Sequence, residues 1–277
     1  MVAPFEKFDL TGKTALVTGG ATGLGYHMAR ALARAGAKVL IAARRKDVLQ
    51  QATESLMADP YIKHVSWHPV DLADRESVAA LIAYAGNDFG GIDILVGNAG
   101  ATYAEQIADI KPETVDEIYQ LNLTSNIQLA QAFLPRMQER KWGRLIFSSS
   151  IGSVMALPLQ GTVVYSTTKA AVSSLARGLA GDLGHHNITA NSLILGFFMT
   201  DILTDVARQI REAQGAAAAT AFLNEFASNT ALGRIGDPAE IEGLLQLLAS
   251  DAGSYITGAN IAIDGGMSIM MRPLAVT

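Results

Sequence analysis

The sequence contains no cysteine, and this absence excludes two kinds of site at once. Without thiols the chain can form neither a disulfide framework nor a thiolate metal centre. It has five histidines, and two of them, His185 and His186, are adjacent. Adjacent residues do not share a helix face, so we interpret this pair as solvated side chains and not as ligands. The sequence therefore predicts no metal site.

A strong positive charge is also missing. The formal net charge is -5, and the lysines and arginines form no basic run. This argues against a nucleic-acid-binding protein and favours a small-molecule partner. No stretch reaches the roughly 18 consecutive apolar residues that a membrane helix needs, and the opening MVAPFEKFDL lacks the apolar core of a signal peptide. We expect a soluble, cytoplasmic protein with no membrane partner.

What the sequence does contain is a regular alternation of short apolar runs and longer helical patterns. The short runs are continuously apolar, which is typical of strands buried on both faces of a parallel sheet. Because there is no internal repeat or linker, the alternation predicts an α/β fold: one doubly wound parallel sheet with helices on both faces, in a single domain over residues 1–277. The apolar runs lie at 14–19, 38–43, 65–70, 93–100, 143–150, 188–196 and 259–266.

Residues 201–230 interrupt this alternation. The segment DILTDVARQIREAQGAAAATAFLNEFASNT follows the sixth apolar run, and Gly215 divides it into two helical stretches. Its alanine run favours helix but offers no strong apolar anchor to a core. We predict a mobile helical lid over a substrate site, and the alternative is a surface excursion without that role.

A glycine-rich turn, TGGATGLG at 18–25, joins the first apolar run to the first helical pattern. Glycines let the backbone approach a pyrophosphate closely, and a helix N-terminus offers unpaired N–H groups and the positive end of its dipole. The strand–turn–helix context makes this cluster more specific than its letters alone. The turn predicts a phosphate site, against the alternative of a tight turn without a ligand.

The order of the later motifs adds a resemblance to a known family. TGGATGLG has the spacing T-G-x-x-x-G-x-G, and VGNAG, LNLTS, GRLIFSSS, YSTTK, LGFFMTD and IDGG follow it. This ordered set resembles the short-chain dehydrogenase/reductase family, over essentially the whole chain from Leu10 to Gly266. The resemblance implies a Rossmann-type fold, a nicotinamide cofactor, and hydride transfer between a secondary alcohol and a ketone.

The resemblance also implies a set of cofactor-binding residues. Asp71, in VDLAD, matches the residue that contacts the adenine edge, and Thr200 matches the one that holds the nicotinamide carboxamide. Two positions depart from the family pattern: Gly97 stands where asparagine is usual, and Leu195 where proline is common. We therefore expect weaker bracing at Gly97 and a looser segment at Leu195. The expected set is Gly19, Thr22, Gly23, Leu24, Gly25, Arg44, Asp71, Leu72, Asn98, Ala99, Gly100, Tyr165, Lys169, Phe198 and Thr200.

The choice of cofactor depends on IAARRK, at the end of the second apolar run. In this fold an acid there binds the 2′-hydroxyl of NAD, whereas an arginine accommodates the 2′-phosphate of NADP. Ala43 stands where the family's NAD enzymes carry the acid, and Arg44 follows it. Because a guanidinium binds phosphate bidentately, we predict NADP(H), with NAD(H) as the alternative. The plainer interpretation is that Arg44 and Arg45 begin a solvated helix.

Tyr165 and Lys169 are spaced to share one helix face, and no carboxylate lies near them in the sequence. A free phenol has a pKa of about 10, and a neighbouring ammonium should lower it toward the range of an effective general acid. The resemblance implies that Tyr165 exchanges a proton with the substrate oxygen, that Lys169 also binds the nicotinamide ribose, and that Ser150 donates to the same oxygen. Asn122 resembles the residue that holds a proton-relay water. The alternative is a half-buried tyrosine beside a snorkelling lysine.

The identity of the catalytic serine stays open at this point, because several serines lie close together. Counting along the strand from Gly143 favours Ser150, and Ser153 is the second choice. The interval from Ser150 to Tyr165 is slightly longer than the family's usual one, with the excess placed in residues 157–164.

The substrate is the least determined feature. Arg208 and Arg211 would suit an acid or a phosphate, although a solvated helix face is the plainer interpretation. The small residues along 163–184 would let a second helix approach closely and predict a homotetramer. An apolar cleft is expected from Phe197, Phe198, Ile202, Leu203 and Phe222, with Met155 and Tyr103 opposite.

Other functions are weighed against an NADP(H)-dependent oxidoreductase. One is an NAD-dependent sugar-acid or polyol dehydrogenase of the same family. Another is a regulator that binds the cofactor without turnover, which intact Tyr165, Lys169 and Asn122 argue against. Sugar-nucleotide epimerases share Tyr-x-x-x-Lys but use a different glycine spacing and a larger C-terminal region.

Overall fold

The apolar runs form one parallel sheet. The computed structural model describes residues 5–101, 103, 105–157 and 161–270, and within them seven strands pair in the order β3-β2-β1-β4-β5-β6-β7. Every strand lies inside one of the predicted runs, so the predicted α/β sheet is confirmed. The strands are β1 (Thr14–Thr18), β2 (Lys38–Ala43), β3 (Val65–Pro69), β4 (Ile94–Gly97), β5 (Gly143–Ser148), β6 (Ile188–Leu195) and β7 (Asn260–Ile263).

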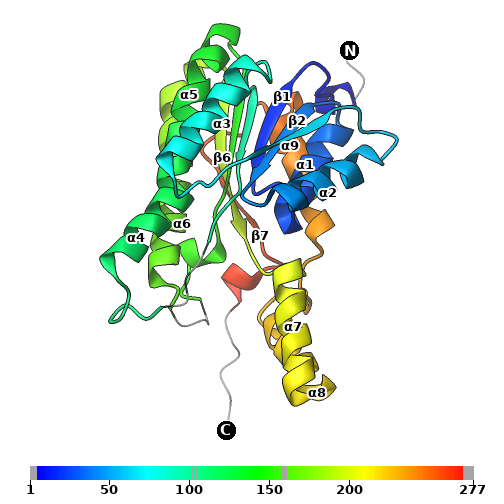
Figure 1. Ribbon diagram of the computed structural model, residues 1–277, viewed down its shortest axis with the longest axis vertical. Coiled ribbons are helices and arrows are strands. Elements are labelled where there is room, and N and C mark those ends of the chain that lie inside the picture. The colour runs from blue at the N-terminus through cyan, green and yellow to red at the C-terminus, as the bar shows by residue number, and fades with distance from the viewer. Residues whose placement is uncertain (1–4, 102, 104, 158–160, 271–277) are drawn as a thin grey trace.

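Helices connect the strands and cover both faces of the sheet (Figure 1). The strand order reverses between β1 and β4, and a crevice opens at the carboxyl ends of strands at such a point. No helix of the described ranges is long and apolar enough to cross a membrane. The helices are α1 (Gly23–Arg34), α2 (Lys46–Met57), α3 (Arg75–Asn87), α4 (Pro112–Tyr119), α5 (Ser125–Arg140), α6 (Val163–Leu183), α7 (Asp201–Gln214), α8 (Ala216–Ser228) and α9 (Ile241–Ala249).

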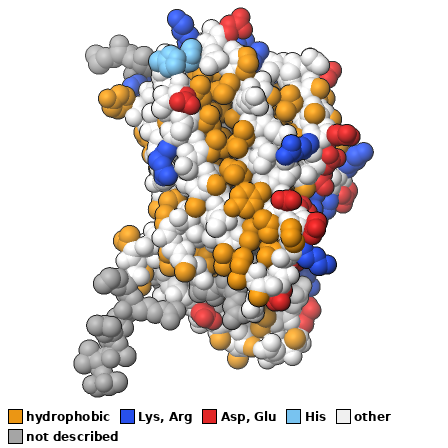
Figure 2. Space-filling model, turned by 90° about the vertical axis from the view of Figure 1, so that its left-hand side faces the viewer, with side chains coloured by type: hydrophobic (Ala, Val, Ile, Leu, Met, Phe, Trp, Pro, Cys, Tyr) orange, Lys and Arg blue, Asp and Glu red, His pale blue; other side chains and the backbone are white. Residues whose placement is uncertain are grey.

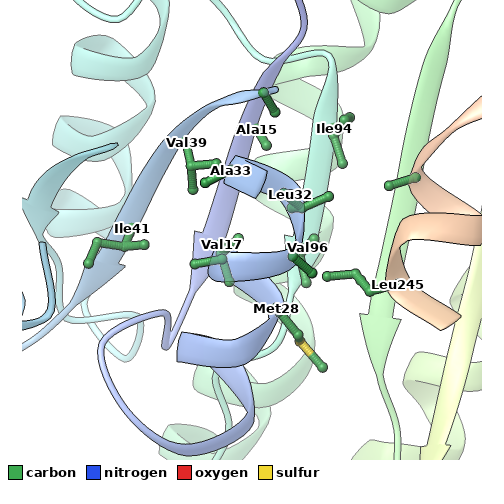
Figure 3. Packing of buried hydrophobic residues seen from close by; sticks show 14 of the residues in the cluster. Ala15, Val17, Met28, Leu32, Ala33, Val39, Ile41, Ile94, Val96 and Leu245 are labelled. Carbon is green, nitrogen blue, oxygen red and sulfur yellow. The ribbon is translucent and has the colours of Figure 1, made fainter. Parts of the chain in front are cut away.

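Strand alternation divides the core into two clusters. Ala15 and Val17 of β1 point to the face covered by α1, α2 and α9, whereas Leu16 points to the face covered by α3, α5 and α6. Figure 3 shows Met28 of α1 close to Val17 in the first cluster. Because both faces are covered, the strands can be apolar at every position, as the sequence showed.

The segment after β6 forms the two helices that the sequence predicted. Gly215 separates α7 from α8 with φ +91, a conformation that favours glycine. The pair extends beyond the end of the sheet at the bottom of Figure 1. At Leu195, where a looser segment was expected, the chain pairs with Ile263 in β7, and the Gly196 N–H donates to the Ile263 carbonyl at 3.1 Å.

Candidate active site

The glycine-rich turn between β1 and α1 has the conformation that only glycine adopts easily. Gly19 and Gly23 have φ values of +64 and +52. At Gly25 the constraint is space: a Cβ there would collide with the Gly19 carbonyl oxygen and lie 2.6 Å from Asn98 Nδ2. The turn also meets the segment after β6, since a Cβ on Gly23 would lie 3.3 Å from Thr200 Cγ2. The backbone at the start of α1 is therefore open to a close ligand.

A cavity of about 830 Å³ runs along the carboxyl ends of the strands. Its lining includes every residue of the predicted cofactor-binding set, from Gly19 in the glycine turn to Thr200 at the start of α7, together with Ser150. Asn122 and Ser153 do not belong to the lining. The glycine-rich turn opens onto this cavity. A tight turn that binds no ligand is therefore the weaker interpretation.

The residues along the cavity fit a dinucleotide. The open glycine backbone at the N-terminus of α1 suits a pyrophosphate. Arg44 and Arg45, both exposed, stand at the exit of β2, and Asp71 follows β3. Lys169 and Tyr165 lie at the other end of the same cavity wall, on α6. These groups could hold a nucleotide at one end and place its reactive ring beside Tyr165.

Asn98 ties the exits of three neighbouring strands together. Its side-chain amide donates to the Thr18 carbonyl at 3.1 Å, and its Oδ1 accepts from Ser148 Oγ at 3.1 Å. The backbone N–H groups of Asn98 and Ala99 both donate to Thr18 Oγ1, at 3.0 and 3.1 Å. The loop that follows β4 is thereby fixed against β1 and β5, next to the glycine turn.

The space beside Gly97, where weaker bracing was expected, is occupied by another side chain. A Cβ on Gly97 would collide with the side-chain oxygen of buried Asn126, which comes from α5. Asn126 Nδ2 donates to the Asn122 carbonyl at 2.8 Å. A side chain from a distant helix therefore fills the space that a larger residue at position 97 would take, and only the tertiary structure reveals this exchange.

Ser150 is the serine that contacts Tyr165. The Ser150 hydroxyl hydrogen-bonds the Tyr165 phenol, and this bond acts to lower the phenol's pKa. Ser153 Oγ instead donates to the Ser150 carbonyl at 2.6 Å, within a short 3-10 turn over Ile151–Ser153. The geometry therefore favours Ser150 over Ser153. Residues 158–160, part of the longer interval before Tyr165, lie outside the described residues.

The other serines hold α6 against the sheet. Ser149 Oγ donates to the Lys169 carbonyl at 2.9 Å and lies 2.8 Å from Ser173 Oγ. Ser192 of β6 donates to Ser173 at 3.3 Å. This buried series of hydroxyls fixes the position of α6, and so it sets where Tyr165 and Lys169 lie along the cavity.

Lys169 has no carboxylate partner among the ion pairs of the described part of the chain. The residue is 4% exposed, and its ammonium donates to the Ser148 carbonyl at 2.9 Å and lies 5.7 Å from the centre of the Tyr165 ring. That bond uses one of the three donors of the group. Burial lowers the pKa of Lys169 to about 8.

The expected direction of the Tyr165 pKa is wrong for this structure. Burial raises the pKa of Tyr165, and the hydrogen bond from Ser150 opposes that rise. The loss of water around both groups, which the sequence does not reveal, destabilises a phenolate as well as an ammonium and outweighs the nearby cation of Lys169. The phenol is therefore a protonated donor at neutral pH.

Asn122 is fully buried, in a π-helical turn (Gln120–Thr124) between α4 and α5. Its Oδ1 accepts from the Ala101 N–H at 2.9 Å, and its Nδ2 donates to the Ala101 carbonyl and to Thr168 Oγ1, both at 3.0 Å. These bonds join the loop after β4 to α6. The side chain is therefore committed to protein partners, and its role as holder of a relay water stays a prediction.

Several apolar residues line the cavity that were not predicted from the sequence. Phe226 follows Phe222 by one helical turn, a spacing that could have revealed it. Of the residues expected opposite, Met155 packs into a small core cluster and Tyr103 donates to Glu117 at 2.6 Å, and neither lines the cavity. The side chain of Ile202 lies outside the described residues. The lining residues that were missed include Ile151, Leu157, Val206 and Phe226.

Known proteins are similar to this chain in sequence and in architecture over almost their full length. Residues 19–268 match a family model described as Enoyl-(Acyl carrier protein) reductase. Oxidoreductase UcpA of Salmonella typhimurium is 34% identical over 261 residues, which cover 94% of this chain and 96% of that protein. The 3alpha-hydroxysteroid dehydrogenase of Mediterraneibacter gnavus is 32% identical over 256 residues, which cover 92% of this chain and 97% of that protein. Among solved structures, L-sorbose reductase from Gluconobacter frateurii, complexed with NADPH and L-sorbose, has a TM-score of 0.89 at 29% identity and covers 96% of this chain and 100% of its own.

Proposed function

The chain belongs to the short-chain dehydrogenase/reductase family, and from that premise we propose that it interconverts a secondary alcohol and a ketone with NADP(H). Membership makes it an NAD(P)-dependent oxidoreductase. The preference for NADP(H) and the role of Tyr165 are our proposal. The observation that carries it is the hydrogen bond between the Ser150 and Tyr165 hydroxyls, in a cavity whose only buried cation among the described lining residues is Lys169.

The cofactor would lie along the glycine turn. The backbone of residues 19–25 and the N-terminus of α1 would bind its pyrophosphate, and Arg44 would bind the 2′-phosphate. Lys169 would bind the nicotinamide ribose with the donors that Ser148 leaves free, and Thr200 would bind the carboxamide. When bound, NADPH supplies a hydride to the carbonyl carbon and is oxidised to NADP⁺.

Tyr165 would complete the reduction as general acid. Its phenol donates a proton to the carbonyl oxygen, so that the ketone gains one hydride and one proton and becomes a secondary alcohol. Because burial raises the pKa of Tyr165, the phenol keeps that proton at neutral pH. Ser150 donates a hydrogen bond to the same oxygen and stabilises the charge that develops there.

The catalytic proposal is tested by NADPH oxidation with a panel of ketones, under single-turnover conditions. We expect oxidation in step with formation of the secondary alcohol, measured by absorbance and by product analysis. NADPH binding without oxidation by any ketone in the panel would favour the regulator that lacks turnover.

The cofactor preference is tested by a double variant, Ala43→Asp with Arg44→Leu. The new carboxylate repels a 2′-phosphate and binds a ribose hydroxyl, and the lost guanidinium removes charged hydrogen bonds worth about 1.5–3 kcal/mol. The ratio of kcat/KM for NADPH over NADH should therefore fall by roughly 10- to 100-fold. Arg44→Lys, which keeps the charge, serves as the control and should retain most of the preference. An unchanged ratio in the double variant would place phosphate recognition elsewhere, with Arg45 the next residue to test.

Residues 201–230 are proposed to act as the substrate lid, within the single domain that the sequence predicts. Both α7 and α8 contribute side chains to the cavity lining, among them Leu203 and Phe222. The two helices stand beyond the end of the sheet (Figure 1), where a small movement would open or close the cavity. This arrangement supports the proposed lid.

A homotetramer is proposed for the assembly. The side of the molecule that carries α4, α5 and α6 in Figure 1 displays an apolar band in Figure 2. Exposed apolar side chains on these helices include Tyr119, Ile127 and Val163. An exposed apolar surface of this kind could be buried in a two-fold contact between copies of the chain. Light scattering at micromolar concentration tests the prediction, and the mass of a monomer would contradict it.

A further inference from the structure

The cavity wall next to Ser150 is strongly apolar. Ile151 follows Ser150 directly, and Leu157 and Phe197 pack against the cluster that contains Ile151. The Phe197 ring meets Phe226 edge-on, with centroids 4.5 Å apart, and Phe226 meets Phe222 at 5.0 Å. All of these side chains line the cavity. An aromatic surface made by Phe197, in the segment after β6, and by α8 therefore begins beside the two hydroxyls at the reaction centre.

The charges of the lining lie away from this aromatic surface or have the wrong sign for an anion. Among the described lining residues the cations are Arg44, Arg45 and Lys169. The two arginines stand at the exit of β2, and Lys169 is buried against the Ser148 carbonyl. A negatively charged substrate would therefore lose its hydration beside the aromatic rings without gaining a cation.

The described residues of the 201–230 helices add no cation to the cavity lining. Asp201 lines the cavity and would repel an anion. Arg208, which the sequence offered for an acidic substrate, is exposed, pairs with Asp205 and Glu212, and does not line the cavity. Arg211 is also exposed and does not line it.

We infer that the substrate is an uncharged, bulky apolar ketone, or the corresponding secondary alcohol, with an aryl or alicyclic group seated against Phe197, Phe222 and Phe226. This inference rests on the proposed function, because it places the carbonyl at Ser150 and Tyr165. It disfavours sugar acids, which bring a carboxylate, and ketohexoses, whose several hydroxyls would be buried against rings that accept few hydrogen bonds.

The test compares three ketones with NADPH: 4-phenylbutan-2-one, its para-carboxylate and L-sorbose. We expect kcat/KM for the neutral aryl ketone to exceed that of the carboxylate by about 100-fold, the effect of burying an unpaired charge. L-sorbose should be poorer than the neutral ketone as well. A carboxylate or a sugar that is used as well as the neutral ketone would overturn the inference and leave the proposed function standing.

Calorimetric titration of the same compounds into enzyme saturated with NADP⁺ separates binding from turnover. Tighter binding of the neutral aryl ketone supports the inference even if none of the three is reduced, a result that would count against the proposed function alone. Equal binding of all three, or no binding of any, overturns the inference.

A charge placed on the aromatic surface should change the preference. Phe222→Lys provides a cation on a stem that still covers apolar surface, so kcat/KM for the para-carboxylate relative to the neutral ketone should rise by roughly 10-fold. Phe5→Lys makes the same exchange at a side chain that is 86% exposed and does not line the cavity, and it should leave the ratio unchanged. The same rise in both variants would show that net charge and not the aromatic surface sets the preference.

Discussion

Tyr165→Phe should lower kcat for ketone reduction by about 10²- to 10⁴-fold, the range that a general acid contributes. The substitution removes the hydroxyl that meets Ser150 and leaves the ring in place. The affinity for NADPH should stay close to that of the wild type, because the groups proposed to bind it are unchanged: the backbone of the glycine turn, Arg44 and Lys169. The free energy of unfolding should fall by about 1 kcal/mol, because one hydrogen bond is lost. Steady-state rates, fluorescence titration with NADPH and thermal unfolding measure the three quantities.

Tyr255→Phe provides the matched control. Tyr255 is fully exposed at 101% and does not line the cavity, so the loss of its hydroxyl should change neither kcat nor stability. If Tyr165→Phe retains more than about a tenth of kcat, the general-acid assignment is wrong, since that would be a smaller loss than any such group accounts for. A variant that loses NADPH binding as well would point to a structural role for the ring.

Gly25→Ala should weaken NADPH binding by about 10- to 100-fold. The added methyl would collide with the Gly19 carbonyl, and crowding of this kind costs about 1–3 kcal/mol when backbone must move. The movement would open the turn that presents its N–H groups to the pyrophosphate, and it would disturb Asn98, whose Nδ2 lies 2.6 Å from the new atom. The dissociation constant for NADPH should therefore rise, and the melting temperature should fall.

Gly86→Ala is the control for this substitution. Gly86 is an exposed residue of α3, and a Cβ there would have no atom within 4 Å. Alanine in a helix is about 0.5–1 kcal/mol more favourable than glycine, so this variant should melt slightly higher and bind NADPH normally. Wild-type affinity in Gly25→Ala would show that the turn does not hold the cofactor as proposed.

The fold was largely predictable because its signals are local. A continuous apolar run marks a strand covered on both faces, and each of the observed strands lies within such a run. Glycine at 19, 23 and 25 marks a turn whose conformation and close contacts require it. The split of the 201–230 segment at Gly215 could be predicted for the same reason, since the residue takes a positive φ. Each of these features depends on a few neighbouring residues.

The sequence predicted which residues line the site, but not how those residues contact one another. Every residue of the predicted cofactor-binding set lines the cavity, yet the choice between Ser150 and Ser153 needed the path of the chain after β5. The space at Gly97 is filled by Asn126, from another helix, so no pattern around position 97 could reveal it. The aromatic surface is likewise assembled from the segment after β6 and from α8, which only folding brings together.

The sequence by itself determined the order of strands and helices, the glycine turn and the placement of Tyr165 and Lys169 on one helix face, because backbone geometry and side-chain size act over short distances along the chain. The tertiary structure alone decided the direction in which the Tyr165 pKa moves, the serine that meets it and the apolar wall beside it. Burial is the physical reason: the water that a group loses is excluded by segments far away in sequence.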